Sequence, residues 1–204
     1  MYKNMSKKST KERLVDASAK LFADRGFTSV SVNDICVLAS ANIAAVNYHF
    51  SNKQKLYDET LKYAFSQENN PWNNVSDIEK IPAEQRMFNF IKMHITQAFS
   101  PDEGSCFNKL LLRELVEKNI SDISIIMEII KPLKNCIEGF LRELTGENAS
   151  DNTILLLRYS LMSQCMMPMI SPIAKGFLLQ TSVSNITKHV YNTMMATIKE
   201  INIK

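Results

Sequence analysis

Residues 31–57 read SVNDICVLASANIAAVNYHFSNKQKLY, and this stretch decides the fold. Ser31 followed by Asp34 forms a capping-box pattern, so a helix of about two turns with a short apolar stripe is expected to begin there. After a tight break, Asn42 is a good N-cap for the next short helix, which runs to about Phe50. Two short helices joined by a tight turn predict a helix-turn-helix.

The flanking sequence predicts one helix on each side of this motif. Ser9 and Glu12 form another capping-box pattern before an apolar periodicity that indicates a helix over about 10–25. Gly26 is expected to end that helix, because glycine accepts a left-handed conformation without steric cost. Residues 53–66 carry apolar side chains on one side and predict a fourth helix, which links two domains.

The rest of the chain is also expected to be helical, since it has few glycines and prolines and lacks alternating β-branched runs. The polar segment around Pro71 marks a boundary between an N-terminal domain over 1–66 and a C-terminal domain over 67–204. Pro132 is expected to kink the helix that contains it. The expected helices are 83–99, 106–119, 122–144, 152–170 and 180–201, with a break at Ser171, Pro172 and Gly176 before the last.

Composition and charge limit the class of protein. The chain of 204 residues has 45% hydrophobic and 22% charged residues, which is typical of a folded globular protein. Residues 1–60 hold nine Lys or Arg against six Asp or Glu, and the remainder is balanced, so a polyanionic partner is expected to meet the N-terminal end. Because the start lacks a secretory signal and no apolar run approaches the ~20 residues of a membrane span, we expect a cytoplasmic protein without membrane contact.

The cysteines and histidines do not form a recognisable metal or catalytic pattern. Cys36, Cys106, Cys136 and Cys165 are widely spaced, so we interpret them as buried reduced thiols and leave a redox-sensing thiol as the alternative. His49 has no second histidine at helical spacing and no nucleophile motif near it. His94 and His189 are expected to be surface or interhelical hydrogen bonders. The sequence therefore favours a protein that is not an enzyme and that has no metal or other cofactor.

The short helix after Asn42 has two faces of different character. At 100° per residue, Val46 and Phe50 fall on one face and are expected to pack, while Asn47 and Tyr48 fall on the opposite face. Small alanines near the start of the helix let its backbone approach a DNA groove closely. An Asn side chain can pair with N6 and N7 of adenine, so this face has the chemistry of a recognition helix.

The stretch 10–65 resembles the DNA-binding domain of the TetR/AcrR family. Its motifs appear in order as LFADRGF at 21–27, SVNDI at 31–35 and NIAAVNYHFSNKQKLY at 42–57. Asn47 within AAVNYHF, together with LLLRE at 110–114, makes the chain similar to the CecR-like branch of that family.

The resemblance implies which residues touch DNA. The implied phosphate contacts are Ser31, Tyr48, His49 and Lys53, the implied major-groove residues are Ile43, Ala44, Ala45, Asn47 and Tyr48, and Asn33 is implied as a base or phosphate contact. Two positions depart from the family pattern, because Ser40 replaces the usual glycine of the turn and Ile43 replaces a polar or basic residue. The operator sequence therefore cannot be taken over from relatives. For the N-terminal Lys3, Lys7, Lys8 and Lys11, a minor-groove arm and a solvated tail remain alternatives.

The methionine-rich segment LMSQCMMPMI at 161–170 has two interpretations, core filler or the lining of an adaptable ligand pocket. The resemblance implies an effector site in this C-terminal region. The predicted lining is Phe90, His94, Phe107, Leu111, Tyr159, Met162, Met166 and Met169. Few charges accompany these residues, so a small apolar or aromatic effector is expected.

The leading hypothesis is a ligand-responsive transcriptional repressor that binds a palindromic double-stranded operator as a homodimer and is released by its effector. The last helix carries the apolar stripe Ile186, Val190, Met194 and Ile198, and the helix before it, with residues 154–157 and Tyr159, is apolar nearly all round and is expected to be buried on two sides. Together they predict a dimer through a four-helix bundle of these two helices from each chain. Two alternatives are a nucleoid or structural DNA-binding protein without an effector and an enzyme with a vestigial DNA-binding end.

Overall fold

The computed structural model describes residues 8–67, 80–100, 106–117, 123–146 and 149–203. All regular structure in these ranges is helical, which confirms the all-α fold class expected from the sequence. The described residues pack as two compact units. The N-terminal unit takes those up to residue 69 and those between 105 and 129, and the C-terminal unit takes the others.

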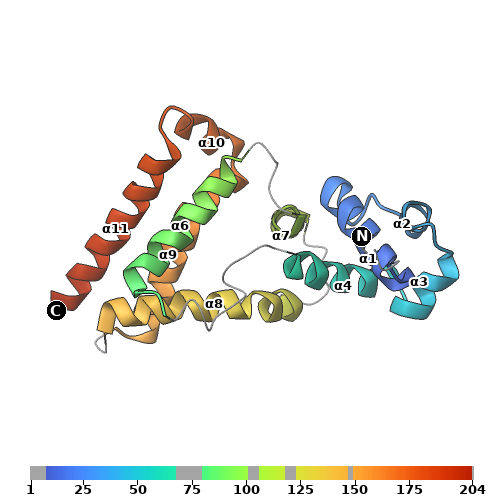
Figure 1. Cartoon of the computed structure of the whole chain (residues 1–204), viewed down its shortest axis with the longest axis horizontal. Helices are drawn as coiled ribbons and strands as arrows, with labels where there is room; N and C mark the ends of the chain where they lie inside the picture. The colour runs from blue at the N-terminus through green and yellow to red at the C-terminus, as the bar shows by residue number, and fades with distance from the viewer. Residues whose placement is uncertain (1–7, 68–79, 101–105, 118–122, 147–148, 204) are drawn as a thin grey trace, which may run out of the picture. The chain divides into compact units, whose positions relative to one another are not determined.

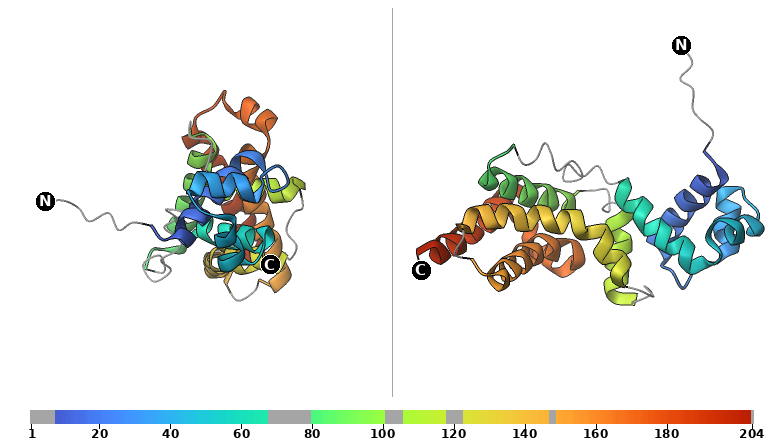
Figure 2. Two further views of the ribbon diagram at one scale, coloured as in Figure 1. Left: turned by 90° about the vertical axis from the view of Figure 1, so that its right-hand side faces the viewer. Right: turned by 90° about the horizontal axis from the view of Figure 1, so that it is seen from below.

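The N-terminal unit is built around α1. Its helices are α1 (Thr10–Arg25), α2 (Val32–Ala39), α3 (Ile43–Phe50), α4 (Lys53–Ser66), α7 (Cys106–Glu117) and the first residues of α8 (Ile123–Thr145). Helix α1 contacts α2, α3, α4 and α7, and α4 and α7 also contact each other (Figures 1 and 2). Residues 106–117 and 123–129 therefore pack with the N-terminal helices, whereas the sequence pattern had grouped them with the C-terminal part. The domain boundary after residue 66 stays a prediction.

Side-chain caps fix where the first helices begin and end. The Ser9 hydroxyl accepts a hydrogen bond from the Glu12 amide at 3.2 Å, and the Glu12 carboxylate accepts one from the Ser9 amide at 2.7 Å. Ser31 and Asp34 repeat this reciprocal pair at the start of α2. Gly26 ends α1 with a φ of 81°. Both predicted capping boxes and the predicted glycine stop are confirmed, and each cap contributes about 1 kcal/mol.

The core of the N-terminal unit comes from the faces that the helical periodicity predicted. Val46 and Phe50 of α3 are buried, as expected. Deep inside, the hydroxyls of Ser18 on α1 and Thr60 on α4 lie 2.6 Å apart and satisfy each other. The other fully buried large apolar side chains of these helices include Leu14, Phe22, Ile35, Leu56 and Leu61.

The C-terminal unit contains α6 (Ala83–Ala98), most of α8, α9 (Asp151–Ile170), α10 (Pro172–Leu178) and α11 (Val183–Ile203). Helix α6 packs against both α9 and α11, which also contact each other (Figure 1). Two ion pairs attach α8: Arg86 of α6 pairs with Glu143, and the Nε of Arg158 on α9 lies 3.1 Å from Glu138 Oε1. The helices expected here from the sequence agree with the observed bounds to within three residues over the described ranges.

The stripe on α11 has a different partner from the expected one. Ile186, Val190, Met194 and Ile198 are all buried within the chain itself, in one hydrophobic cluster with residues of α6, α8 and α9. The inference that this face needs a second subunit to cover it was therefore wrong, because α6 and α9 of the same chain cover it.

A short helix, α10, lies where the sequence predicted only a break. Proline at the first position of a helix needs no amide donor and has a suitable φ, so Pro172 begins α10 instead of preventing it. The Ser171 hydroxyl caps the helix by accepting from the Ala174 amide at 3.2 Å. The predicted break is limited to Ser171, which has an extended conformation between α9 and α10.

Three of the four cysteines match the expectation of buried reduced thiols. Cys36, Cys136 and Cys165 are buried, whereas Cys106 is only half-buried. The thiol of Cys106 donates to the carbonyl oxygen of Ala19 on α1 at 3.3 Å, which holds it near the surface of the α1–α7 contact.

Burial of Cys165 predicts a pH dependence of stability. Desolvation raises the pKa of this thiol from 9.0 to about 12. Below pH 9 the thiol is protonated in both folded and unfolded chains, and between pH 9 and 12 only the unfolded chain loses the proton. The free energy of unfolding should therefore fall there by up to about 1.4 kcal/mol per pH unit.

Chemical denaturation of the wild type and of Cys165→Ala under reducing conditions checks this. The variant should lose about 1 kcal/mol at pH 7 and show a shallower decline above pH 9. Parallel curves for the two proteins between pH 9 and 12 would contradict the assignment.

Candidate nucleic-acid interface

Helix α3 presents one free face. Asn47 and Ala44 are exposed, Tyr48 is 85% exposed and Ile43 is 48% exposed, although the last two are large and partly apolar. Ala45 is half-buried beside them. The face opposite the core is thus available to a partner, as the periodicity predicted, and it combines an amide with small and apolar side chains.

Capping bonds fix where α2 and α3 begin. The Oδ1 atom of Asn42 accepts from the Ala44 amide at 2.9 Å, which confirms Asn42 as the N-cap of α3. At α2, the Ser31 hydroxyl donates to Asp34 Oδ2 at 2.6 Å, and this bond and the backbone bond from Ser31 lower the pKa of Asp34. Ser31 and Asn33 both remain exposed at the start of α2. A helix N-terminus with exposed polar side chains is a suitable site for a phosphate.

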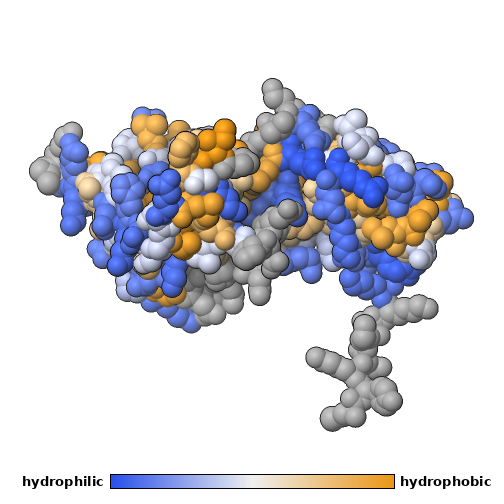
Figure 3. Space-filling view, turned by 90° about the horizontal axis from the view of Figure 1, so that it is seen from above, coloured by the Kyte–Doolittle hydropathy of each residue, from blue (hydrophilic) through white to orange (hydrophobic). Residues whose placement is uncertain are grey.

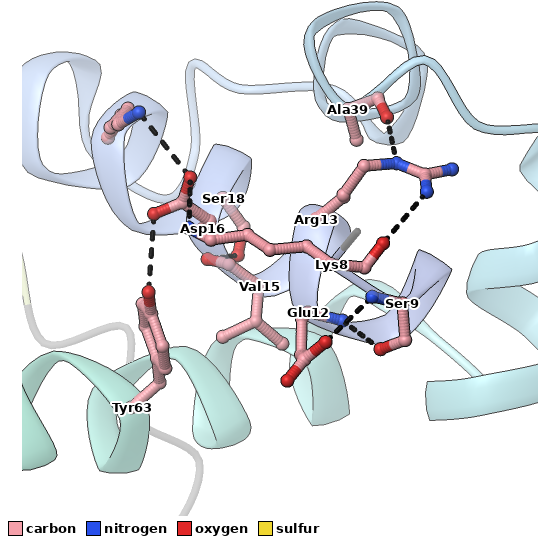
Figure 4. Close-up of polar contacts among 10 residues, drawn as sticks. Lys8, Ser9, Glu12, Arg13, Val15, Asp16, Ser18, Ala39 and Tyr63 are labelled. Atoms are coloured by element: carbon pink, nitrogen blue, oxygen red, sulfur yellow. Dashed lines mark hydrogen bonds and ion pairs between the residues drawn. The ribbon is translucent and has the colours of Figure 1, made fainter. Parts of the chain in front are cut away.

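The turn between α2 and α3 is fixed by Arg13 of α1, a residue that the sequence pattern did not single out (Figure 4). Its Nε donates to the Ala39 carbonyl at 3.0 Å, as Figure 4 shows. Its Nη2 donates to the Ser40 carbonyl at 3.4 Å. These carbonyls end α2 and have no helical partner of their own. Ser40 has a left-handed conformation with a φ of 49°, which explains why glycine is the usual residue at this position.

Asp16 of α1 contacts two lysines and a tyrosine near the start of the unit (Figure 4). It lies 3.4 Å from the ammonium groups of both Lys8 and Lys20, and it accepts a hydrogen bond from the Tyr63 hydroxyl of α4 at 3.3 Å. Partial burial alone would raise the pKa of Asp16, but the two lysines outweigh it and lower the pKa. Of the basic N-terminal residues, Lys8 is thus engaged with α1, and Lys3 and Lys7 lie outside the described residues.

The residues implied as phosphate contacts have different surroundings. His49 is half-buried, and its ring lies 4.9 Å from that of Tyr48. Lys53 is the first residue of α4, where Asn52 supplies the N-cap by accepting from the Lys55 amide at 2.8 Å. The Lys53 ammonium lies 4.3 Å from the centroid of the Phe27 ring, and desolvation lowers its pKa.

Helix α7 contributes two polar residues that brace these helices. Arg113 donates from Nε to the Ala23 carbonyl at 2.9 Å and from Nη2 to the Asp24 carbonyl at 2.6 Å, which caps the end of α1. Glu114 is buried and accepts a hydrogen bond from the Tyr57 hydroxyl of α4. Both residues belong to the LLLRE stretch at 110–114, whose position was visible in the sequence but whose contacts were not.

No group of three or more His, Cys, Asp or Glu suited to a metal ion occurs in the described part of the chain. Within the same residues, none of the helices has the length and apolar character needed to cross a membrane.

Two family models match the chain. Residues 14–60 match the model described as "Bacterial regulatory proteins, tetR family". Residues 83–202, which are more than half of the chain, match the model described as "HTH-type transcriptional dual regulator CecR, C-terminal domain". The chain belongs to the TetR family.

Curated relatives of this TetR-family chain are transcriptional regulators. It is 26% identical over 106 residues to the biofilm operon negative regulator IcaR of Staphylococcus aureus (strain Newman), an alignment that covers 47% of this chain and 57% of IcaR. It is 30% identical over 57 residues to the repressor NicS of Pseudomonas putida, covering 28% of this chain and 27% of NicS. The matched proteins are thus covered only in part.

Solved structures show the same fold. The regulator FadR from Bacillus subtilis in complex with stearoyl-CoA has a TM-score of 0.64 at 18% identity, covering 90% of this chain and 96% of FadR. Reduced E. coli NemR has a TM-score of 0.67 at 14% identity, covering 90% of this chain and 95% of NemR. At these identities the likeness establishes the TetR-type fold of the chain and nothing finer.

The residues predicted to line an effector pocket fall into both units. Phe107 and Leu111 belong to α7 of the N-terminal unit, where the Phe107 ring packs edge-on at 5.0 Å against Phe65 of α4. In the C-terminal unit, Phe90 is fully buried in the hydrophobic cluster and Met162 packs against it, whereas Tyr159 is 60% exposed. The remaining methionines of the set, Met166 and Met169, are half-buried on α9. The predicted lining therefore stays a prediction.

His94, another member of this set, bonds to its own helix. Its Nδ1 lies 2.9 Å from the Phe90 carbonyl oxygen, one turn earlier in α6. The expectation of a surface or interhelical bond was wrong, because the imidazole folds back along α6. Burial lowers the pKa of His94, which favours a neutral ring in a largely apolar setting.

Proposed function

We propose that this TetR-family regulator represses transcription by binding an operator through α3 and that a small molecule releases it. The exposed face of α3, held by caps at α2, α3 and α4, is the observation that carries this proposal. A helix-turn-helix places the exposed start of its second helix in the major groove and the residues around it on phosphates. The cytoplasm, where bacterial DNA lies, is the expected compartment.

The exposed residues divide into two kinds of DNA contact. Asn47 offers both a donor and an acceptor to a base edge, and Ile43 offers an apolar side chain to a thymine methyl group. Ser31, Tyr48 and Lys53 surround this face with groups suited to phosphate oxygens. Base contacts should set sequence preference, whereas phosphate contacts should set affinity for all sequences.

The first prediction for DNA binding therefore separates Asn47 from Lys53. Asn47→Ala should weaken operator binding by about 1 to 3 kcal/mol and flatten the ranking of operator variants. Lys53→Ala should weaken binding to all sequences alike and make the salt dependence shallower. Titrations of the purified protein against a set of operator variants at several salt concentrations measure both effects.

Asn192→Ala, at an exposed asparagine on α11 outside the helix-turn-helix, serves as the control and should leave operator binding unchanged. If Asn47→Ala left the ranking of operator variants unchanged, direct readout by this residue would be excluded.

The apolar surface of α9 favours a homodimer. Leu156 and Tyr159 are each 60% exposed, and Met167 and Ile170 continue the same helical face. Apolar residues also reach the surface of the C-terminal unit around α10, and Figure 3 shows such residues on one side of this unit. An apolar face of this kind marks a contact with another protein surface. We assign it to a second copy, with α9 and α11 of each subunit forming a four-helix bundle.

This assignment predicts that Leu156→Glu weakens the dimer, since a carboxylate would lose its hydration at the contact. Light scattering at micromolar concentration should give twice the 23.2 kDa chain mass for the wild type and a lower mass for the variant. Gln85→Glu, which adds the same charge at an exposed site on α6, should remain dimeric. A wild-type protein of single-chain mass would refute the proposed dimer.

The proposed effector is a largely apolar small molecule that binds in the C-terminal region. Flexible methionines adapt to different ligand shapes, and α9 carries several of them beside the hydrophobic cluster. The neutral His94 imidazole adds a polar group without a net charge. The stearoyl-CoA bound to FadR, a protein of the same fold, makes acyl chains a reasonable class to test alongside aromatic compounds.

Met166→Gln is expected to impair release while leaving operator affinity nearly intact. A polar amide in an apolar lining weakens ligand binding but does not touch α3. Operator release is measured for wild type and variant with a panel of fatty acids, acyl-CoA thioesters and aromatic compounds, with Met127→Gln on α8 as the exposed control. Loss of operator binding in step with folding stability would make Met166 a core residue. Failure of every compound to release the wild type would favour an effector-independent DNA-binding protein.

A further inference from the structure

Lys53 has an unusual neighbour for a phosphate-binding lysine. Its ammonium lies 4.3 Å from the ring centroid of Phe27, and within the described ranges no carboxylate lies at ion-pair distance from it. The neighbouring Lys55, by contrast, is paired with Asp58 at 3.7 Å. The Lys53 charge is therefore held by an aromatic face and stays available to an anion.

The Phe27 ring is itself held in place from two sides. Its centroid lies 5.7 Å from that of Phe22 and 5.0 Å from that of Tyr57, with the Tyr57 ring inclined at 61°. Phe27 directly follows Gly26, whose positive φ sets the direction in which the chain leaves α1. A side chain at Gly26 would collide with the Glu117 carboxylate, whose oxygens lie 2.7 and 2.8 Å from the place of a Cβ atom.

Helix α7 fixes the far end of this stack. The Tyr57 hydroxyl donates to the buried Glu114 carboxylate, and Arg113 bonds the last carbonyls of α1 just before Gly26. Burial and the Glu114 carboxylate both raise the pKa of Tyr57, so the phenol keeps its proton and remains a donor. The contacts thus run without a gap from α7 through Tyr57 and Phe27 to Lys53.

We propose that Phe27 is a positioning residue that holds the Lys53 ammonium ready for a DNA phosphate, and that Tyr57 of α4, bonded to Glu114 of α7, fixes the Phe27 ring. A free lysine side chain loses considerable rotamer freedom on binding, and a ring that already confines the ammonium reduces that loss. The inference rests on the proposed phosphate contact of Lys53. It adds that this contact depends on the Phe27 ring and, through Tyr57 and Glu114, on the position of α7.

A double-mutant cycle tests the proposal with a random-sequence DNA duplex, because non-specific binding depends on phosphate contacts. In the protein with Lys53, Phe27→Leu keeps an apolar side chain but removes the aromatic face, and the dissociation constant should rise about three- to five-fold. In the Lys53→Ala background the same substitution should have no effect. Phe27→Tyr, which keeps the aromatic face, should restore the affinity.

Each outcome points to one conclusion. Equal weakening by Phe27→Leu in both backgrounds would overturn the positioning role and leave Phe27 a packing residue, while the Lys53 contact would stand. Wild-type affinity and salt dependence for Lys53→Ala alone would refute the Lys53 contact and the inference with it.

A second measurement uses the wild-type protein without DNA, so it does not depend on whether the variants fold. The ring current of Phe27 should shift the Cε methylene protons of Lys53 upfield in the NMR spectrum of the wild type, and Phe27→Leu should abolish that shift. An unshifted Lys53 methylene in the wild type would overturn the proposal.

Discussion

The end of α1 sets the constraint on which the N-terminal unit depends. The last carbonyls of a helix have no partner within it, and here the guanidinium of Arg113, carried by α7, bonds those of Ala23 and Asp24. The guanidinium of Arg13 likewise bonds the carbonyls of Ala39 and Ser40 at the end of α2. Bonds from a charged donor contribute about 1.5 to 3 kcal/mol each, so these arginines fix the angles at which the short helices leave one another.

Local patterns predicted the fold well because its signals are local. A capping box needs two side chains three residues apart, and Ser9, Ser31 and Asn42 mark helix starts that the structure confirms. The burial of Val46 and Phe50 follows from the 3.6-residue period alone. The prediction of a break at Pro172 was wrong, because proline has opposite effects at different positions of a helix. Proline interrupts a helix from within, but it also starts one, and the choice depended on the Ser171 cap.

Contacts between distant segments were beyond such reasoning. Arg113 and Glu114 hold α7 against α1 and α4, and their partners lie far away in the sequence, so local patterns gave no sign of these contacts. Periodicity likewise shows that a face is apolar but not what covers it. The stripe of α11 is covered by the same chain, and the exposed apolar face lies instead on α9 at Leu156 and Tyr159. Helical spacing sufficed to predict that Asn47 and Tyr48 lie on the exposed face of α3, and their role in DNA binding stays a prediction.

Helix α7 packs with the helices that present the proposed DNA-binding face, and we expect them to fold as one piece. Native-state hydrogen exchange of the full chain tests it most directly, because amides that open in one cooperative step share one opening free energy. We expect the amides of α7 around Leu110 and Arg113 to exchange with the same opening free energy, and the same denaturant dependence, as those of α1 and α4. Exchange of α7 together with α6 and α11, or at a much lower opening free energy than α1, would contradict it.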